Sequence, residues 1–204
     1  MSWIVLLLVL AAVVAVAALV LLLRSARKAG HARPAIDPFT VGEPWRQLVT
    51  GALRSQARYR ELVAVAPEGA VREQLLAVGG RIDDAVDECW AIAQQGSRLD
   101  RTASQMRIET TVAQLKGGVD DPERAEALQA RIDAHARLVG TARDAEGRLR
   151  LLEARLQESA ARGAELAVAG SAAPVAALES EVGSVTLELE SLRSALEETS
   201  RLGQ

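Results

Sequence analysis

The sequence predicts an all-α protein, in which a transmembrane helix precedes a four-helix bundle with a two-helix coiled-coil arm. Three observations favour this class: an uncharged apolar run at the N-terminus, apolar residues at heptad spacing, and a helix-forming composition. Ala, Leu, Glu and Arg are abundant and only 2% of the residues are aromatic, whereas strands favour aromatic and β-branched residues in alternation. We find no sustained alternation, so no strand is expected.

The N-terminal run is WIVLLLVLAAVVAVAALVLLL, residues 3–23, which contains no charge, glycine or proline. At 1.5 Å per residue it reaches about 31 Å, close to the ~30 Å hydrocarbon core of a bilayer. A cleaved signal peptide fits less well, because no Lys or Arg precedes the run and the run exceeds roughly 15 residues. We therefore expect residues 1–23 to be a membrane anchor, with Trp3 at one interface.

Charge asymmetry around this run predicts its orientation. No basic residue precedes it, whereas four follow in the linker at 24–43, namely Arg24, Arg27, Lys28 and Arg33. Basic residues favour the cytoplasmic side, so we expect an outside N-terminus in the inner membrane and a cytoplasmic domain at 44–204. The same four side chains are expected to contact anionic lipid headgroups.

Four helices are expected in residues 44–204, separated by segments that contain proline or glycine. Their predicted ranges are 44–65, 67–116, 122–169 and 173–202. The second and third are each about 72 Å long and are joined by a short turn, which predicts an antiparallel hairpin. The first and fourth, at about 33 and 44 Å, are expected to pack at the open end of that hairpin and leave a bare arm at the other.

The stretch GGRIDDAVDECWAIAQQGSRLD, residues 79–100, places acidic side chains beside the only cysteine and a tryptophan. A di-iron bundle would need Glu-x-x-His repeats on facing helices. The only histidines are His31 and His135, and Ile132 stands three positions before the latter. We therefore expect no metal site, no acid–base site and no cofactor at this stretch.

The heptad register instead gives the stretch a structural interpretation. It places Ile82 and Cys89 on a buried line, and Trp90 on a second buried stripe beside it. If the first helix folds back antiparallel, Trp45 reaches the level of Trp90. The predicted structural core residues are Trp45, Ile82, Cys89 and Trp90.

The first and second predicted helices carry complementary charges. Four arginines and one acid lie on the first helix, and the acidic stretch lies on the second. Folding back through residues 66–68 would bring Arg46 near Asp87, and Arg60 near Glu73. Each exposed pair contributes only about 0–1 kcal/mol, so we expect these pairs to select the register rather than to stabilise the fold.

Several functional classes are disfavoured by what the sequence contains. The net charge of −3 is unlike that of a nucleic-acid-binding protein, which needs basic surface to neutralise phosphates. We find no phosphate-binding loop, nucleophile elbow or metal-binding signature. We therefore expect neither an enzyme nor a binder of nucleic acid or of a small-molecule substrate.

A resemblance adds to this interpretation. Through RIDDAVDECWAIAQQGSRLD (81–100), GEPWRQLV (42–49) and the N-terminal run, the chain resembles a set of uncharacterised actinobacterial single-pass membrane-anchored helical proteins. In layout alone it is similar to the septation-ring regulators of Gram-positive bacteria, and no motif carries their function over.

Anchor, heptads and the missing catalytic motifs together favour a membrane-anchored scaffold. We expect it to dock protein partners at the inner face of the membrane and to contact membrane lipid. The protein partner is either a different protein or further copies of this chain. A membrane-stress or signalling component that senses lipid through the basic linker is the alternative.

Overall fold

The computed structural model describes residues 35–169 and 173–202. These residues form a short 3-10 helix and five α-helices: η1 (Pro38–Thr40), α2 (Trp45–Val65), α3 (Ala70–Gln105), α4 (Ile108–Lys116), α5 (Pro122–Ala169) and α6 (Ala173–Leu202). No strand occurs in these two ranges, so the predicted all-α class is confirmed.

The predicted anchor and most of the predicted linker lie outside the described residues. Trp3, Arg24, Arg27, Lys28 and Arg33 are therefore not placed. Within the described ranges, no helix combines the length and the apolar character that a membrane crossing requires.

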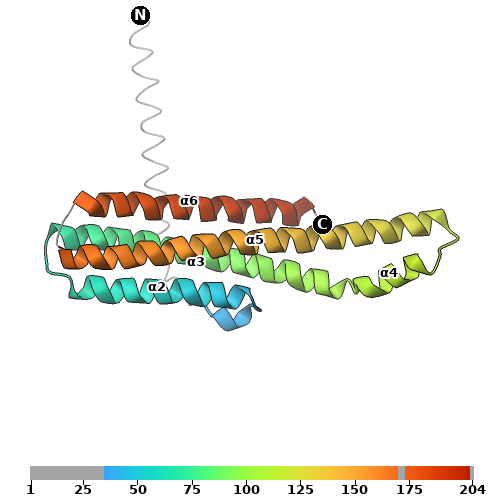
Figure 1. The fold of residues 1–204 in the computed structure, drawn as a ribbon, viewed down its shortest axis with the longest axis horizontal. Coiled ribbons are helices and arrows are strands. Elements are labelled where there is room, and N and C mark those ends of the chain that lie inside the picture. Colours follow the sequence, from blue (N-terminus) through green and yellow to red (C-terminus); the bar gives the residue numbers. More distant parts are fainter. Residues whose placement is uncertain (1–34, 170–172, 203–204) are drawn as a thin grey trace, which may run out of the picture. The chain divides into compact units, whose positions relative to one another are not determined.

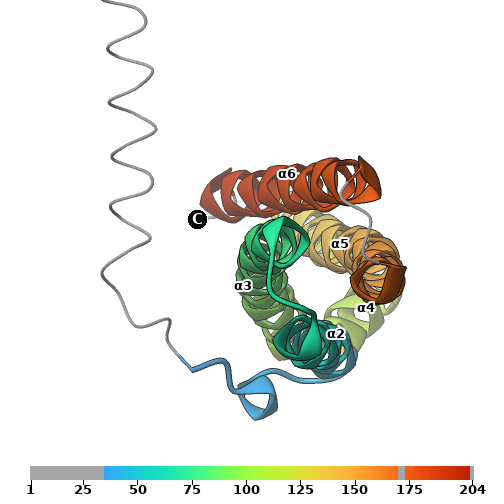
Figure 2. The same ribbon diagram turned by 90° about the vertical axis from the view of Figure 1, so that its left-hand side faces the viewer.

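The chain divides into two compact units, Met1–Ile36 and Asp37–Gln204, and the second contains every described helix. Within it, α3 and α5 form an antiparallel pair that contacts α2 on one side and α6 on the other. Figure 2, which looks along the helices, shows α2 and α6 on opposite sides of this pair. A helical bundle, as predicted, is thus formed by α2, α3, α5 and α6.

The bundle core follows the predicted heptad lines. On α6 the apolar residues at heptad spacing are all buried, namely Val175, Leu178, Val182, Val185, Leu189, Leu192 and Leu196. Thr199, the last position of this line, is exposed. The facing lines on α3 and α5 are buried as well: Leu75, Val78, Ile82, Ala85, Cys89 and Ile92, and Leu149, Leu152 and Leu156. The apolar heptad residues of α6 therefore pack against α3 and α5 of the same chain.

The bundle ends near Asp100 on α3, which accepts a hydrogen bond from Trp45, the first residue of α2. On α5 it ends near Thr141, which lines the same groove as Thr199 of α6. Beyond this level the chain continues as a hairpin in which α4 packs along α5 (Figure 1). We call residues 101–140 the arm.

The helix predicted over 67–116 was expected to be continuous, and this is corrected by the structure. The chain breaks at Met106 and Arg107, where Arg107 adopts a left-handed conformation with φ 45° and ψ 54°. Such a conformation costs a non-glycine residue roughly 1–2 kcal/mol. Arg131 of α5 compensates in part, because its guanidinium donates a hydrogen bond to the Met106 carbonyl at 2.5 Å.

Two aromatic rings on α2 determine how this helix sits on the other helices. The Trp45 ring lies over Gly96 of α3, and the Tyr59 ring lies over Gly163 of α5. A Cβ atom at either glycine would overlap the ring, so glycine is needed at both contacts.

Each of these rings also has a polar anchor. Trp45 Nε1 donates to Asp100 Oδ2 at 2.7 Å, and the Tyr59 hydroxyl donates to the Leu75 carbonyl at 2.9 Å. Trp45 thus lies level with Gly96 and Asp100, and not level with Trp90 as predicted. The register of α2 on α3 is therefore offset by roughly two helical turns from the expected one.

Candidate functional site

The acidic stretch at 79–100 lies in the middle of α3, where α2, α5 and α6 all contact that helix. Cys89 is 1% exposed within it. Burial, together with the negative charges of Glu153 and Glu88, raises the pKa of the Cys89 thiol to about 12. A thiol that stays protonated at neutral pH is a poor nucleophile and a poor metal ligand, so Cys89 acts as a small apolar core residue.

The acidic side chains of the stretch join α3 to its neighbours. Asp83 accepts hydrogen bonds from Gln56 Nε2 and from an Arg60 guanidinium nitrogen of α2, both at 2.8 Å. Glu88 accepts one from Arg193 Nε of α6 at 2.7 Å. In the part of the chain that the structure describes, no group of three or more His, Cys, Asp or Glu residues is arranged to hold a metal ion.

The two predicted ion pairs are corrected by these contacts. Arg60 pairs with Asp83 and not with Glu73. Arg46 donates to the Val41 carbonyl and lies 3.7 Å from a Glu43 carboxylate oxygen, instead of reaching Asp87. The reason is the register set by Trp45 and Tyr59, which moves α2 along α3 past the expected partners.

Three of the four predicted core residues are confirmed. Trp45, Ile82 and Cys89 are each 1% exposed. Trp90 is the exception, because its side chain is only half-buried. The Trp45 ring sits over Gly96 further along α3 and so does not cover Trp90 as the predicted register required.

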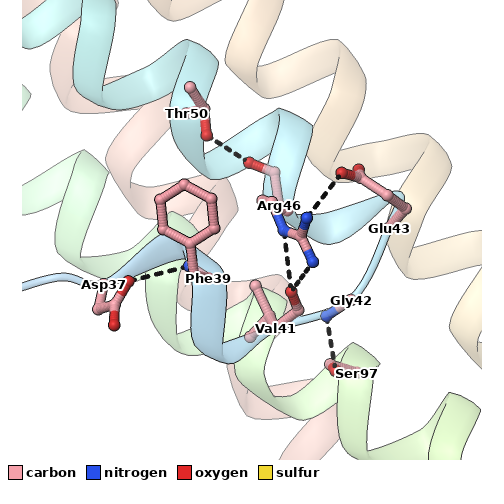
Figure 3. Close-up of polar contacts among 8 residues, drawn as sticks. All are labelled: Asp37, Phe39, Val41, Gly42, Glu43, Arg46, Thr50 and Ser97. Carbon is pink, nitrogen blue, oxygen red and sulfur yellow. Dashed lines mark hydrogen bonds and ion pairs between the residues drawn. The ribbon is translucent and has the colours of Figure 1, made fainter.

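The segment that leads into α2, residues 37–46, forms a compact structure that the sequence did not predict (Figure 3). We call it the η1 segment. The Asp37 carboxylate accepts a hydrogen bond from Phe39 N at 3.0 Å and caps η1. Gly42 N donates to Ser97 Oγ of α3 at 3.4 Å, which ties the segment to the bundle.

The same segment exposes a large aromatic ring beside a cation. Phe39 is 79% exposed, and the guanidinium carbon of Arg46 lies 5.5 Å from its ring centroid. Figure 3 shows the Arg46 side chain directed to the Val41 carbonyl and the Glu43 carboxylate. The only sequence signal for this feature is the single phenylalanine of the chain, which stands in the predicted linker.

The sequence also did not predict a buried carboxylate, that of Glu153. Glu153 of α5 is 8% exposed, and a Cβ on Gly51 of α2 would overlap its carboxylate. Burial raises the pKa of Glu153, while a hydrogen bond from Gln157 and the positive charge of Arg54 act in the opposite direction. The sequence places Glu153 in an otherwise apolar heptad context, LRLLEARL, which gives no reason to expect its burial.

Two open grooves of about 430 Å³ flank α2. The groove shared with α3 is lined mainly by Tyr59, Val63, Leu76, Gly79 and Gly80. The groove shared with α5 carries the side chains of Arg54 and Arg58. The lining of neither groove contains a histidine or a cysteine.

The described residues thus define a class of structure, an all-α helical bundle with a projecting two-helix arm. Comparison with known proteins finds no matching family model, no similar curated protein and no similar solved structure.

Proposed function

We propose that the protein is a single-pass membrane-anchored scaffold, which docks protein partners at the inner face of the membrane. The observation that carries the proposal is the uncharged run at 3–23, which is long enough to span a bilayer and is followed by four basic residues. The domain that follows is a bundle with a projecting arm, a shape suited to presenting surface to other proteins.

The η1 segment supports a position close to the membrane. It begins only a few residues after Arg33, the last of the four basic linker residues, and it exposes the Phe39 ring beside the Arg46 guanidinium. Aromatic and cationic side chains are both favoured at the level of lipid headgroups. The segment can therefore contact the membrane surface while Gly42 and Trp45 hold it to the bundle.

Membrane fractionation of the full chain tests the anchor. We expect the protein to stay in the membrane fraction after alkaline extraction, and a C-terminal tag to be digested only after the cells are opened. Replacing Leu8 and Val14 by arginine should release the protein, because a charge at the bilayer centre costs about 2.5–3.5 kcal/mol. Replacing the same two residues by isoleucine is the matched control. Release of the unaltered chain would overturn the proposal.

The second candidate function is lipid sensing, as part of a membrane-stress or signalling component. The basic linker and the exposed Phe39–Arg46 pair favour it, because each basic residue near an anionic surface contributes about 1 kcal/mol. Co-sedimentation of residues 24–204 with vesicles separates the two functions. Binding to anionic but not to neutral vesicles, lost when the four linker residues are replaced by glutamine, supports sensing. Equal recovery with both vesicle types removes it.

A further inference from the structure

The arm leaves its apolar side chains incompletely covered. Between residues 106 and 140, Thr111 is the only side chain that is buried. The larger apolar side chains of this stretch are all half-buried: Met106, Ile108, Val112, Leu115, Val119, Leu128, Ile132, Leu138 and Val139. In the bundle, by contrast, the apolar heptad residues of α6 are 6% exposed or less. Two helices alone cannot enclose a core, so the arm has apolar surface available for a further layer.

Charges on the arm are not neutralised by ion pairs within the described residues, although Arg101, Asp121, Arg131 and Asp133 form hydrogen bonds within the chain. Every ion pair found in residues 35–169 and 173–202 joins side chains outside the arm. The arm nevertheless carries twelve exposed Asp, Glu, Lys and Arg side chains. Charged side chains that form no ion pair within the described residues remain available for pairing with the charges of another surface.

These charges are segregated along the arm. The tip, residues 112–126, carries four acids and two bases, namely Asp120, Asp121, Glu123, Glu126, Lys116 and Arg124. The base, residues 101–111 and 127–140, carries four arginines and two acids, namely Arg101, Arg107, Arg131, Arg137, Glu109 and Asp133. The tip is therefore net negative and the base net positive, by the same amount. Such an arm is complementary to a second copy of itself that runs in the opposite direction.

We propose that the arms of two copies pair antiparallel, with the acidic tip of each against the basic base of the other. The half-buried apolar side chains then supply the buried area, and the charges select the direction. The α5 part of the arm, from Pro122 to Gly140, is about 28 Å long, which allows a four-helix contact over several turns. A two-fold axis across the arms makes the assembly a closed dimer. This inference does not depend on membrane anchoring.

Charge reversal at the two ends of the arm tests the proposal. The tip variant carries Asp120→Arg and Glu123→Arg, and the base variant carries Arg101→Glu and Arg137→Glu. Self-association of the full chain in detergent is measured by analytical ultracentrifugation, with the detergent contribution subtracted. We expect each variant alone to dimerise about ten-fold more weakly or worse, because like charges then face each other.

Mixing the two variants is the decisive measurement. In an equimolar mixture, the basic tip of one variant meets the acidic base of the other, and the unaltered acidic tip meets the unaltered basic base. We therefore expect the mixture to form dimers nearly as well as the unaltered chain. Restoration on mixing also shows that both variants are folded. The matched control is Glu165→Arg with Glu190→Arg, two exposed sites on the bundle, which should leave self-association unchanged.

Other outcomes would overturn the proposal. An unaltered chain that stays monomeric at high concentration would mean that the arm is covered by a different partner. Variants that dimerise as well as the unaltered chain would place the contact elsewhere. A mixture of the tip variant with the unaltered chain that associates more strongly than either alone would indicate parallel arms, with tip against tip.

Discussion

The bundle and the arm are built from the same pair of antiparallel chain segments, yet their interiors differ. In the bundle α3 and α5 are covered by α2 and α6, and their heptad residues are almost inaccessible. In the arm the hairpin continues with the same kind of apolar spacing, and the corresponding residues are only half-buried. Heptad spacing therefore predicts which face of a helix is apolar, whereas the burial of that face depends on how many helices cover it.

The two regions also differ in how their helices are held in register. Glycine–aromatic contacts and ion pairs between helices occur in the bundle, as at Trp45 with Gly96 and at Arg193 with Glu88. In the arm, the described contact that ties α5 to the break is the hydrogen bond from Arg131 to the Met106 carbonyl. We expect substitutions in the two regions to differ in effect accordingly.

The largest effect is expected at the end of the bundle, in the Trp45→Ala variant. Loss of the completely buried ring removes its packing over Gly96 and leaves Asp100 without the indole donor. We expect destabilisation by about 3–5 kcal/mol in urea unfolding followed by circular dichroism. The matched control is Trp90→Ala, which removes a half-buried ring and should cost less than half as much. Equal losses of stability in the two variants would contradict the position of α2 on α3, in which Trp45 and not Trp90 is buried.

How far sequence reasoning reaches can be judged from these same elements. The predicted ranges of α5 and α6 agree with the structure at both ends, because proline or small flexible residues stand at each boundary. The break at Met106 carries no such signal, since neither glycine nor proline occurs there and the apolar spacing continues through it.

The register of α2 could not be predicted for a related reason. It depends on two rings that each need a glycine on another helix, and in the sequence Gly96 and Gly163 only appear as weak helix formers. These two ring–glycine contacts shift α2 along α3. The shift changes the ion-pair partners of Arg46 and Arg60 and leaves Trp90 half-exposed. Burial of Glu153 was missed for the same reason, because the space for it is made by Gly51 on a different helix.

A second prediction compares two apolar residues of α5 directly. Leu156 lies in the bundle and is completely buried, whereas Ile132 lies in the arm and is half-buried. We expect Leu156→Ala to cost about 2–5 kcal/mol and Ile132→Ala about 1 kcal/mol, measured at low protein concentration where the arms are unpaired. A cost for Ile132→Ala as large as that for Leu156→Ala would show that the arm already has a closed core within one chain.

A third prediction concerns the glycine beneath Tyr59. In Gly163→Ala the new methyl group overlaps the Tyr59 ring, so the ring or the helix must move. We expect destabilisation by about 1–3 kcal/mol in thermal or urea unfolding. Gly147 lies on the same helix with no heavy atom close to its Cβ position, and Gly147→Ala should stabilise the protein by up to about 1 kcal/mol. Stabilisation by both substitutions would contradict the ring–glycine contact.

The smallest effect is expected from Glu153, and it depends on pH. Its raised pKa means that the folded state holds the proton more tightly than the unfolded state. The contribution of this group to stability is therefore fully present below the unfolded pKa, about 4.3, and is lost as the pH rises through the folded pKa. In Glu153→Gln the loss cannot occur, so we expect the variant to gain stability relative to the unaltered chain as the pH rises above the unfolded pKa.

Urea unfolding at intervals across this range measures the difference. Gln157→Leu is the companion variant, because it removes the hydrogen-bond donor that stabilises the charged Glu153 carboxylate. The pKa of Glu153 should then rise further, and stability should fall more steeply with pH than in the unaltered chain. Parallel stability curves for all three proteins would mean that water reaches Glu153 freely. The bundle interior would then be open to water at this level. The difference in solvent access between bundle and arm would be smaller than the burial of Leu149 and Leu156 indicates.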